Sequence, residues 1–372
     1  MVKNIFTKIG LVISSIILAL LLSEVAVRIF LPQQLILIRP DIWIPDDPLG
    51  WRHAPNLDTR VNTGERTVRL MTDARGYRVG TQRVIDPELR VLALGDSFIA
   101  ALQVENEQSV AGILEKDLSE VSARRVQVVN TGVGGWGPSH YLLKAREELK
   151  RQRYDAVVVF FFIGNDVREQ RHERFPPKTR VREHPFQWPR NFTSSEIVYG
   201  ILSPINEALE TRSHLCVFVK NRAWFLLMKF GLNARNFPDI FLKSETTSSK
   251  GDITAGLFCD IKKISDQHET PLLLVIIPGE YQVDETLAYD YARAMNIQND
   301  VIDMDQPARL LFPKFEACGL AILDATEPFK QAHGRGFKNL FGKVDTHLSP
   351  VGHQLLADLV EPELLKLLKT KP

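Results

Sequence analysis

Residues 156–163 read AVVVFFFI, and this run decides the fold. It shows no alternation of polar and apolar residues, so a strand formed by it must be buried on both faces. Such strands are typical of the centre of a parallel sheet that helices cover on each side. Residues 271–277, PLLLVII, form a second run of this kind. The two runs therefore predict an α/β fold built on a buried parallel sheet.

Weaker signals on either side of these runs complete the pattern. Shorter strands are predicted at 90–94, 126–129 and 320–323, and helices at 109–120 and 138–152. Ser349 as N-cap and Pro350 at the first helical position signal a last helix. Because strands and helices alternate, we expect a doubly wound parallel sheet in three layers, as in flavodoxin-like folds.

The N-terminus carries the longest apolar segment of the chain. Residues 9–31 are long and apolar enough to span a bilayer, and Lys3 and Lys8 before them favour a cytoplasmic N-terminus. Glu24 and Arg28 lie four residues apart, so they can pair on a helix. No small-x-small cleavage site follows, so we interpret the segment as an uncleaved signal anchor, a single transmembrane helix. The alternatives are a buried core helix or a fortuitous apolar end on a soluble cytoplasmic protein.

The sequence divides into three parts. Residues 1–31 are the expected anchor, and 32–90 are rich in turn signals, which predicts a membrane-proximal extended or strand-rich segment. Residues 91–372 are the expected α/β domain, with an insertion at about 167–253 where the alternation of strands and helices breaks. Within it, SETTSSKGD at 244–252 is interpreted as a linker.

Charge and cysteine content exclude several classes of protein. A formal net charge of +1 argues against a nucleic-acid partner, because no basic surplus exists to displace counterions from phosphates. Cys216, Cys259 and Cys318 form no C-x-x-C pair, so neither a zinc ribbon nor a redox motif is indicated. One disulfide with a free thiol and three thiols both remain open. We expect no metal.

A glycine-rich stretch, NTGVGGWGP at 130–138, matches the dinucleotide fingerprint G-x-G-x-x-G. That fingerprint needs an acidic residue at the end of the following strand, about 20 residues on, to hold a ribose. Asp155 precedes the strand and Asp166 comes too late. The loop also follows the second predicted strand rather than the first. We therefore expect this backbone to face the oxyanion of an ester under attack, and we expect no organic cofactor.

Polar side chains follow the predicted strands, at the edge where ligands gather in such sheets. A serine, a histidine, an acid and several N–H donors are among them, and together these are the parts that acyl transfer needs. We predict Ser97 as the nucleophile, His347 as its general base and Asp345 as the residue that orients the imidazole. The predicted oxyanion donors are the backbone N–H groups of Ser97 and Gly135 and the side-chain amide of Asn165.

Here the sequence resembles the SGNH (GDSL-type) hydrolases. Their four blocks stand in order as ALGDSF at 93–98, NTGVGG at 130–135, GND at 164–166 and DTHLSPVGH at 345–353. The resemblance implies a three-layer α/β hydrolase in which Ser97, Gly135, Asn165 and His347 carry the family roles and Asp345 supports the histidine. The D-x-H spacing departs from the usual D-x-x-H. It is similar to the D-x-H-W phrase of SGNH-like alginate O-acetyltransferases, with Leu348 in place of the tryptophan.

The resemblance and the anchor together imply a bacterial enzyme of the inner (cytoplasmic) membrane with its catalytic domain in the periplasm. The implied substrate is an O-acyl group, O-acetyl first of all, on a carbohydrate, a cell-envelope polymer or a small ester. Three alternatives remain: an O-acyltransferase of exopolysaccharide modification, a lipid esterase, and a non-catalytic binding protein that keeps the fold.

Several residues carry two interpretations. His353 competes with His347 as the base, although it fits better as a packing residue of the last helix. Asp96 is expected to bind loop amides rather than to act in a triad. The tryptophans Trp51, Trp136 and Trp188 either stack on sugar rings or belong to the local core. The arginine-rich stretch 168–190 either recognises an anionic substrate or is a solvated loop.

Overall fold

The computed structural model of the protein describes residues 2–33, 35, 42–63, 66–164, 205, 208–209, 212–229, 238–243, 245–294, 297–342 and 346–369. Asn165 and Asp345, both predicted site residues, lie outside these ranges, as does the stretch 168–190 with Trp188. The chain forms two compact units. One consists of Met1–Leu37 and Arg182–Asn233, and the other of Ile38–Val181 and Ala234–Pro372.

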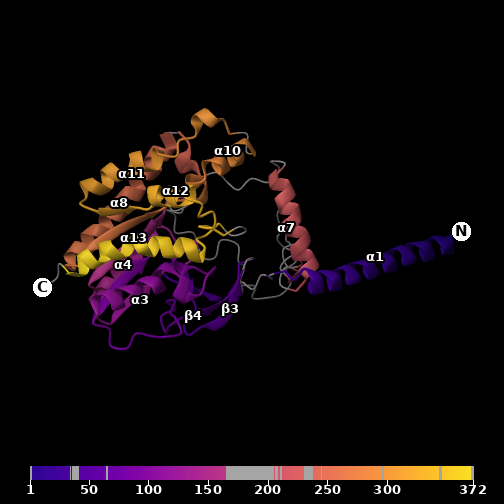
Figure 1. Ribbon diagram of the computed structural model, residues 1–372, viewed down its shortest axis with the longest axis horizontal. Helices are drawn as coiled ribbons and strands as arrows, with labels where there is room; N and C mark the ends of the chain where they lie inside the picture. Colours follow the sequence, from indigo (N-terminus) through magenta and orange to yellow (C-terminus); the bar gives the residue numbers. More distant parts are fainter. Residues whose placement is uncertain are drawn as a thin grey trace. The chain divides into compact units, whose positions relative to one another are not determined.

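The larger unit is built on a five-stranded parallel sheet (Figure 1). Its strands, in the order β6-β5-β7-β8-β9, are β6 (Val126–Asn130), β5 (Leu89–Leu94), β7 (Ala156–Phe162), β8 (Leu272–Ile277) and β9 (Ala321–Asp324). The two apolar runs of the sequence are β7 and β8, which pair over six residues from Val157↔Leu272 to Phe162↔Ile277. The prediction of a doubly wound parallel sheet is confirmed.

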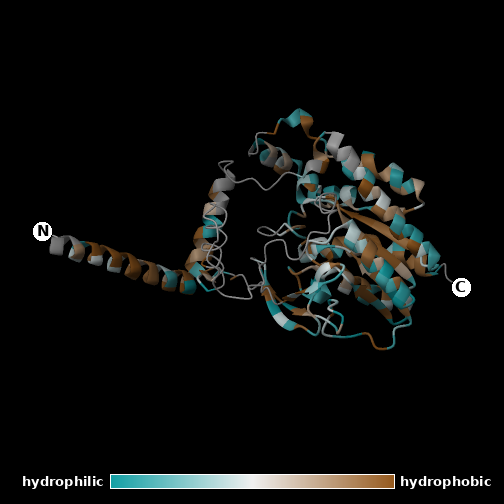
Figure 2. Ribbon diagram, turned by 180° about the vertical axis from the view of Figure 1, so that it is seen from behind, coloured by the Kyte–Doolittle hydropathy of each residue, from teal (hydrophilic) through white to brown (hydrophobic). Residues whose placement is uncertain are grey.

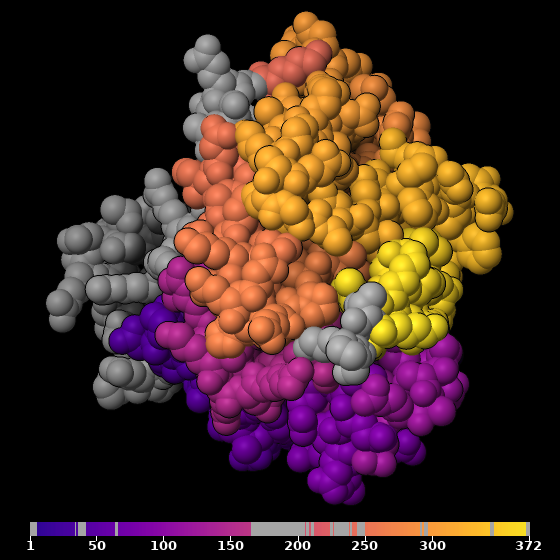
Figure 3. Space-filling view, turned by 90° about the vertical axis from the view of Figure 1, so that its left-hand side faces the viewer, coloured from indigo at the N-terminus to yellow at the C-terminus, as the bar shows by residue number. Residues whose placement is uncertain are grey.

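Helices cover both faces of the sheet. On one face α3 (Val110–Ser122) packs against α13 (Pro350–Lys369); on the other α8 (Glu245–Gln267) packs against α4 (Pro138–Arg151) and α11 (Gln306–Ala317). Figure 3 shows the yellow C-terminal segment lying against the purple part of the chain. The shorter elements are α2 (Ser97–Ala100), α9 (Glu280–Val283), α10 (Glu285–Ala294), α12 (Thr326–Gly334), η2 (Asn106–Gln108), η4 (Asp239–Phe241) and η5 (Asn299–Val301).

The side chains of β7 explain why its sequence lacks alternation. Val158 and Phe160 belong to the core cluster with residues of α3 and α13. Phe161 points to the other layer, where its ring centroid lies 4.9 Å from that of Phe258 on α8 and 6.4 Å from that of Phe315 on α11. Both faces of the strand are therefore buried under helices, and a polar residue on either face would lose its hydration.

The chain before β5 forms two antiparallel hairpins. β1 (Trp43–Asp46) pairs with β2 (Gly50–His53), and β3 (Asp58–Asn62) pairs with β4 (Thr67–Met71). The chain then runs past the edge strand β6, where Arg78 bridges to Asn130. We call residues 42–84 the N-terminal segment; its Trp51 and Arg78 both reach the predicted site.

The linker interpretation of 244–252 is wrong. Residues 245–252 form the first turns of α8, a helix of 23 residues. Serine, threonine and glycine weaken a helix, but burial of Ala255, Phe258 and Ile261 further along α8 outweighs that preference. Cys259 of α8 forms a disulfide with Cys318, and Cys216 is free. Of the two alternatives for the cysteines, the structure therefore has one disulfide with a free thiol.

The smaller unit contains α1 (Val2–Phe30) and α7 (His214–Lys229). Within α1 the stretch Phe6–Phe30 has a mean hydropathy of 2.4, and α1 is mostly brown in Figure 2. It is long and apolar enough to cross a membrane, a property that signal sequences share. The carboxylate of Glu24 binds Arg28, as predicted, and also accepts the N–H groups of His214 and Leu215 at the start of α7.

Candidate active site

Ser97 is the first residue of α2, directly after the tight turn that ends β5. A Cβ at Gly95 would lie 2.5 Å from Cγ1 of Ile99, so the turn closes too tightly for a side chain there. Asp96 is the N-cap, and its Oδ1 accepts the N–H of Phe98 at 2.9 Å. The turn therefore places Ser97 at the C-terminal end of a central parallel strand.

His347 comes from the loop that precedes α13. Its Nε2 lies 2.7 Å from Oγ of Ser97. Two backbone bonds hold the loop, from Gly342 N–H to the His347 carbonyl at 2.9 Å and from Ser349 N–H to the Leu340 carbonyl at 3.0 Å. Ser349 also caps α13 through its hydroxyl, as predicted. The serine hydroxyl and the imidazole are thus in position for proton transfer.

An aromatic pair borders the imidazole. The ring of Phe98 lies 4.8 Å from that of His347 and stacks on Phe162 at 4.0 Å. Phe98 is buried, and Phe162 is the last residue of β7. The pair limits how far the imidazole can turn away from Ser97.

The buried carboxylate of Asp96 also lies close to the serine. Its Oδ2 is 3.3 Å from Oγ of Ser97. Burial raises the pKa of Asp96 to about 6, although the N–H of Phe98 and the charge of His347 oppose the rise. Its main contact is with the backbone N–H of Phe98 in the first turn of α2, so its role is structural, as predicted, although the amide belongs to a helix and not to a loop.

The glycine loop lies against the serine turn. Residues Val133 to Trp136 form a β-turn, closed by the bond from Trp136 N–H to the Val133 carbonyl at 3.2 Å. Gly135 has φ +79°, which only glycine adopts without strain. A Cβ at Gly134 would lie 3.8 Å from Cβ of Ser97, so the loop backbone passes directly beside Ser97.

Asn130 ties this loop to the turn that carries Ser97. Its Nδ2 donates to the Ile99 carbonyl at 2.8 Å, and its Oδ1 accepts the N–H of Gly132 at 3.0 Å. A Cβ at Gly132 would lie 2.7 Å from the backbone nitrogen of Ala100. The glycine there allows two backbones to meet.

Of the predicted site residues, the structure brings together Ser97, His347 and the loop that carries Gly135. Asn165 and Asp345 lie outside the described residues. His353 lies elsewhere: it is buried in α13, and its Nδ1 accepts the N–H of Val110 at 3.3 Å. Burial lowers the pKa of His353 to about 3, so it stays neutral as a packing residue.

The N-terminal segment contributes two residues whose contact with the site the sequence did not predict. The buried guanidinium of Arg78 donates to the carbonyls of Ala100 and Val104 at 2.6 and 2.5 Å, and so holds the end of α2. Burial lowers the pKa of Arg78 to about 10. Trp51 donates its indole N–H to the Gly134 carbonyl at 3.0 Å. No spacing or motif connects these residues to the four blocks.

Two of the three tryptophans considered for sugar stacking, Trp51 and Trp136, belong to the core. Trp51 is 4% exposed and Trp136 is 1% exposed, so neither presents a face on which a sugar could stack. The interpretation of these two residues as local core is confirmed.

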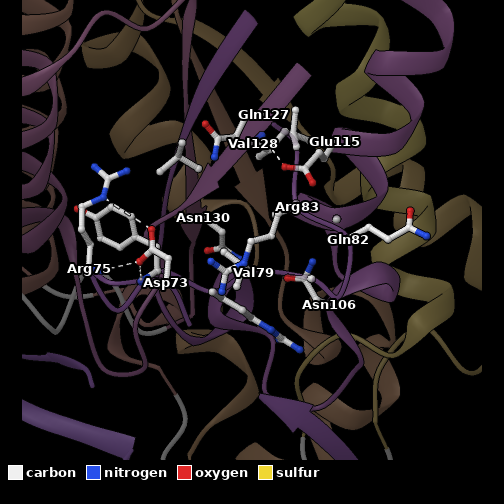
Figure 4. A pocket seen from close by; sticks show the side chains of 17 residues that line it. Asp73, Arg75, Val79, Gln82, Arg83, Asn106, Glu115, Gln127, Val128 and Asn130 are labelled. Atoms are coloured by element: carbon white, nitrogen blue, oxygen red, sulfur yellow. Dashed lines mark hydrogen bonds and ion pairs between the residues drawn. The ribbon is translucent and has the colours of Figure 1, made fainter. Parts of the chain in front are cut away.

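A separate hollow of about 180 Å³ lies between the N-terminal segment, α3 and β6 (Figure 4). Polar and charged side chains line it, among them Asp73, Arg75, Arg83, Asn106, Glu115 and Gln127. Ser97 and His347 do not line it. The carboxylate of Glu115 accepts the N–H of Val128 at 3.0 Å, and burial raises its pKa to about 7. The hollow is therefore not the site of the predicted chemistry.

Metal chemistry has no obvious donors in the described ranges. Within them, no group of three or more His, Cys, Asp and Glu side chains is placed to hold a metal ion.

The chain matches no family model and no curated protein sequence. Several solved structures resemble it in fold. An acetyl xylan esterase, AlAXEase, matches with a TM-score of 0.42 at 12% identity over 74% of this chain and 100% of its own. A member of the lipolytic G-D-S-L family from Veillonella parvula matches with a TM-score of 0.39 at 10% identity, over 75% of this chain and 98% of its own. The acetylxylan esterase Axe2 from Geobacillus stearothermophilus matches with a TM-score of 0.41 at 13% identity, over 76% of this chain and 96% of its own. These scores lie below 0.5, so the function has to be argued from the site itself.

Proposed function

We propose that the protein is a serine esterase of the SGNH type that removes O-acyl groups, O-acetyl first of all, from a carbohydrate or cell-envelope polymer. One observation carries the proposal: Nε2 of His347 lies 2.7 Å from Oγ of Ser97, at the strand edge where the glycine loop passes. A serine hydroxyl is a weak nucleophile until a neighbouring base takes its proton.

The reaction follows from this arrangement. Oγ of Ser97 attacks the acyl carbon while its proton passes to Nε2 of His347, and the carbonyl oxygen becomes an oxyanion. The N–H groups of Ser97 and Gly135 and the amide of Asn165 donate to that oxyanion. The tetrahedral intermediate then collapses, and the leaving alkoxide takes the proton from His347. Water attacks the acyl-serine by the same route, with Asp345 orienting the imidazole throughout.

Rough magnitudes show what each group has to supply. General acid–base catalysis by one positioned side chain contributes about 10²–10⁴ in rate. Each oxyanion donor contributes about 10²–10³.

A second candidate is transfer instead of hydrolysis. The D-x-H spacing at 345–347 is similar to that of alginate O-acetyltransferases, and only the acceptor differs: a sugar hydroxyl takes the place of water in the second half-reaction. Either reaction fits a catalytic unit in the periplasm of a bacterium, held at the inner membrane by α1 as a signal anchor. Recovery of the full-length protein in the soluble fraction without detergent would contradict the anchor.

The test uses full-length protein in detergent, as wild type, Ser97→Ala and the control Ser122→Ala. Ser122 binds a carbonyl of its own helix, that of Leu118, and lies in no catalytic contact. We expect release of acetate from 4-nitrophenyl acetate and labelling by a fluorophosphonate in the wild type and the control, and neither in Ser97→Ala. Acetylated oligosaccharide among the products would select transfer, and preference for long acyl chains would select a lipid esterase. A wild type that neither reacts nor labels would be a binding protein.

We also propose that the arginine-rich stretch 168–190 recognises an anionic polymer. The proposal rests on its charge and its place in the sequence, since the stretch lies outside the described residues. Reversing the charge of its arginines should weaken turnover of an acetylated acidic polysaccharide and leave 4-nitrophenyl acetate unaffected.

A further inference from the structure

Trp51 and the glycine loop are joined by two reciprocal hydrogen bonds. Nε1 of Trp51 donates to the carbonyl of Gly134 at 3.0 Å, and Nε1 of Trp136 donates back to the carbonyl of Trp51 at 3.0 Å. The indole of Trp51 also packs on the loop, since a Cβ at Gly135 would lie 3.2 Å from its Cζ2. Both rings contact His140, with centroids 5.3 and 5.7 Å away. The loop is thus fastened to a strand that lies more than eighty positions earlier in the chain.

The carbonyl that Trp51 binds belongs to the central peptide of a β-turn. Gly135, at the third position of the Val133–Trp136 turn, has φ +79°, and Gly134 does not have a positive φ. A positive φ at the third position alone is the pattern of a type II turn, whereas a type I turn has its central peptide rotated by about 180°. Glycine at both central positions permits either form, so the sequence of the turn does not choose between them.

The orientation of this peptide decides what the loop offers to an oxyanion. In a planar trans peptide the carbonyl of Gly134 and the N–H of Gly135 point in opposite directions. While Trp51 holds the carbonyl on its own side, the N–H of Gly135 points away from the indole. A flipped peptide would exchange the donor for an acceptor, which repels negative charge.

We propose that Trp51 is a positioning residue for catalysis: its indole N–H holds the Gly134–Gly135 peptide in the orientation that directs the Gly135 N–H at the oxyanion. The inference rests on the proposed function, since it concerns a donor of that reaction. It adds a residue from the first hairpin, outside all four sequence blocks, to the machinery of the site.

The test replaces Trp51 in full-length protein by phenylalanine, and in a second variant by 3-benzothienylalanine, which keeps the shape of indole but has no N–H. We expect kcat for 4-nitrophenyl acetate to fall about 10- to 100-fold, less than the 10³ that complete loss of a donor can cost. KM should stay within about twofold, because the lost interaction is made in the transition state. The midpoint of the acid limb of the pH–rate profile should not move, since the Ser97–His347 pair is untouched.

Trp43→Phe is the matched control. Trp43 lies in the same hairpin, and its Nε1 has no hydrogen-bond partner among the described residues. An unchanged kcat in both Trp51 variants, or a loss matched by Trp43→Phe, would overturn the inference in an active enzyme. If the wild type neither cleaves esters nor reacts with a fluorophosphonate, the proposed function itself fails. The benzothienyl variant separates loss of the N–H from loss of fold.

Discussion

His347 places its Nε2 2.7 Å from Oγ of Ser97, although 250 residues separate the two in the chain. One side chain follows a buried strand and the other precedes the last helix. Their meeting therefore depends on the whole sheet between them.

Replacing His347 by alanine should lower kcat/KM by about 10³-fold or more, because Ser97 then has no base. The free energy of unfolding should change little, since His347 is half-buried and sits in a loop. Aryl acetate kinetics and urea unfolding test the two statements.

His353→Ala should do the reverse: activity per folded molecule should be kept, and about 1–3 kcal/mol of stability should be lost, because the position is fully packed. Loss of activity in a folded His353→Ala protein would contradict the assignment.

Stability should fall in acid because of His353. Its pKa is about 3 in the folded protein against an ordinary 6.5, so the unfolded chain binds a proton more readily in between. The stabilisation is complete above pH 6.5 and is lost as the pH falls toward 3. In His353→Gln the free energy of unfolding should fall less between pH 6.5 and pH 3, by at most about 5 kcal/mol. Denaturant unfolding at a series of pH values measures the slope, and identical slopes in both proteins would exclude the effect.

Asp96→Asn should stabilise the protein at pH 7.5. The buried carboxylate has a pKa of about 6 against 3.8, so its charged form is disfavoured by up to about 3 kcal/mol, while an amide oxygen still accepts the Phe98 N–H. The advantage should shrink as the pH falls from 6 to 3.8, because the wild-type carboxyl then becomes neutral in the fold. Asp155→Asn is the control, since Asp155 also accepts a backbone N–H but is partly exposed. An equal gain in both variants would argue against burial as the cause.

Two glycines of the loop should respond differently to alanine. At Gly132 the methyl group would lie 2.7 Å from the backbone nitrogen of Ala100, so the variant should lose about 1–3 kcal/mol of stability. At Gly134 the nearest atom is Cβ of Ser97 at 3.8 Å, so Gly134→Ala should fold normally but turn over bulky esters more slowly. Thermal unfolding and kcat/KM for acetate and butyrate esters distinguish the cases. Equal destabilisation of both variants would contradict the geometry.

The sheet was predictable because a central strand is buried on both faces, so almost every one of its residues is apolar. The runs at 156–163 and 271–277 match β7 and β8 to within one residue at each end. The positions of Ser97 and the glycine loop were predictable because each directly follows a predicted strand, and His347 because it stands in the last of the four sequence blocks. The α8 helix was missed at its start, because its polar first turns carry no helical signal and depend on packing further along.

The contributions of Trp51 and Arg78 could not have been predicted from local pattern. Trp51 donates to one backbone carbonyl that is distant in sequence, and Arg78 donates to several. Such contacts impose no periodicity on the residues around them. A tryptophan in a short hairpin and an arginine in a turn look the same whether they hold a site or merely fill space.

The distance along the chain between Ser97 and His347 also has a consequence in time. At a synthesis rate of about 5–20 residues per second, the ribosome needs roughly 12 to 50 s to make the stretch between them. During that interval Ser97 has no imidazole beside it, and a chain cut short by a premature stop codon never acquires one. Under the proposed function, an incomplete chain therefore cannot cleave esters, and reactivity begins only when the loop that carries His347 has docked.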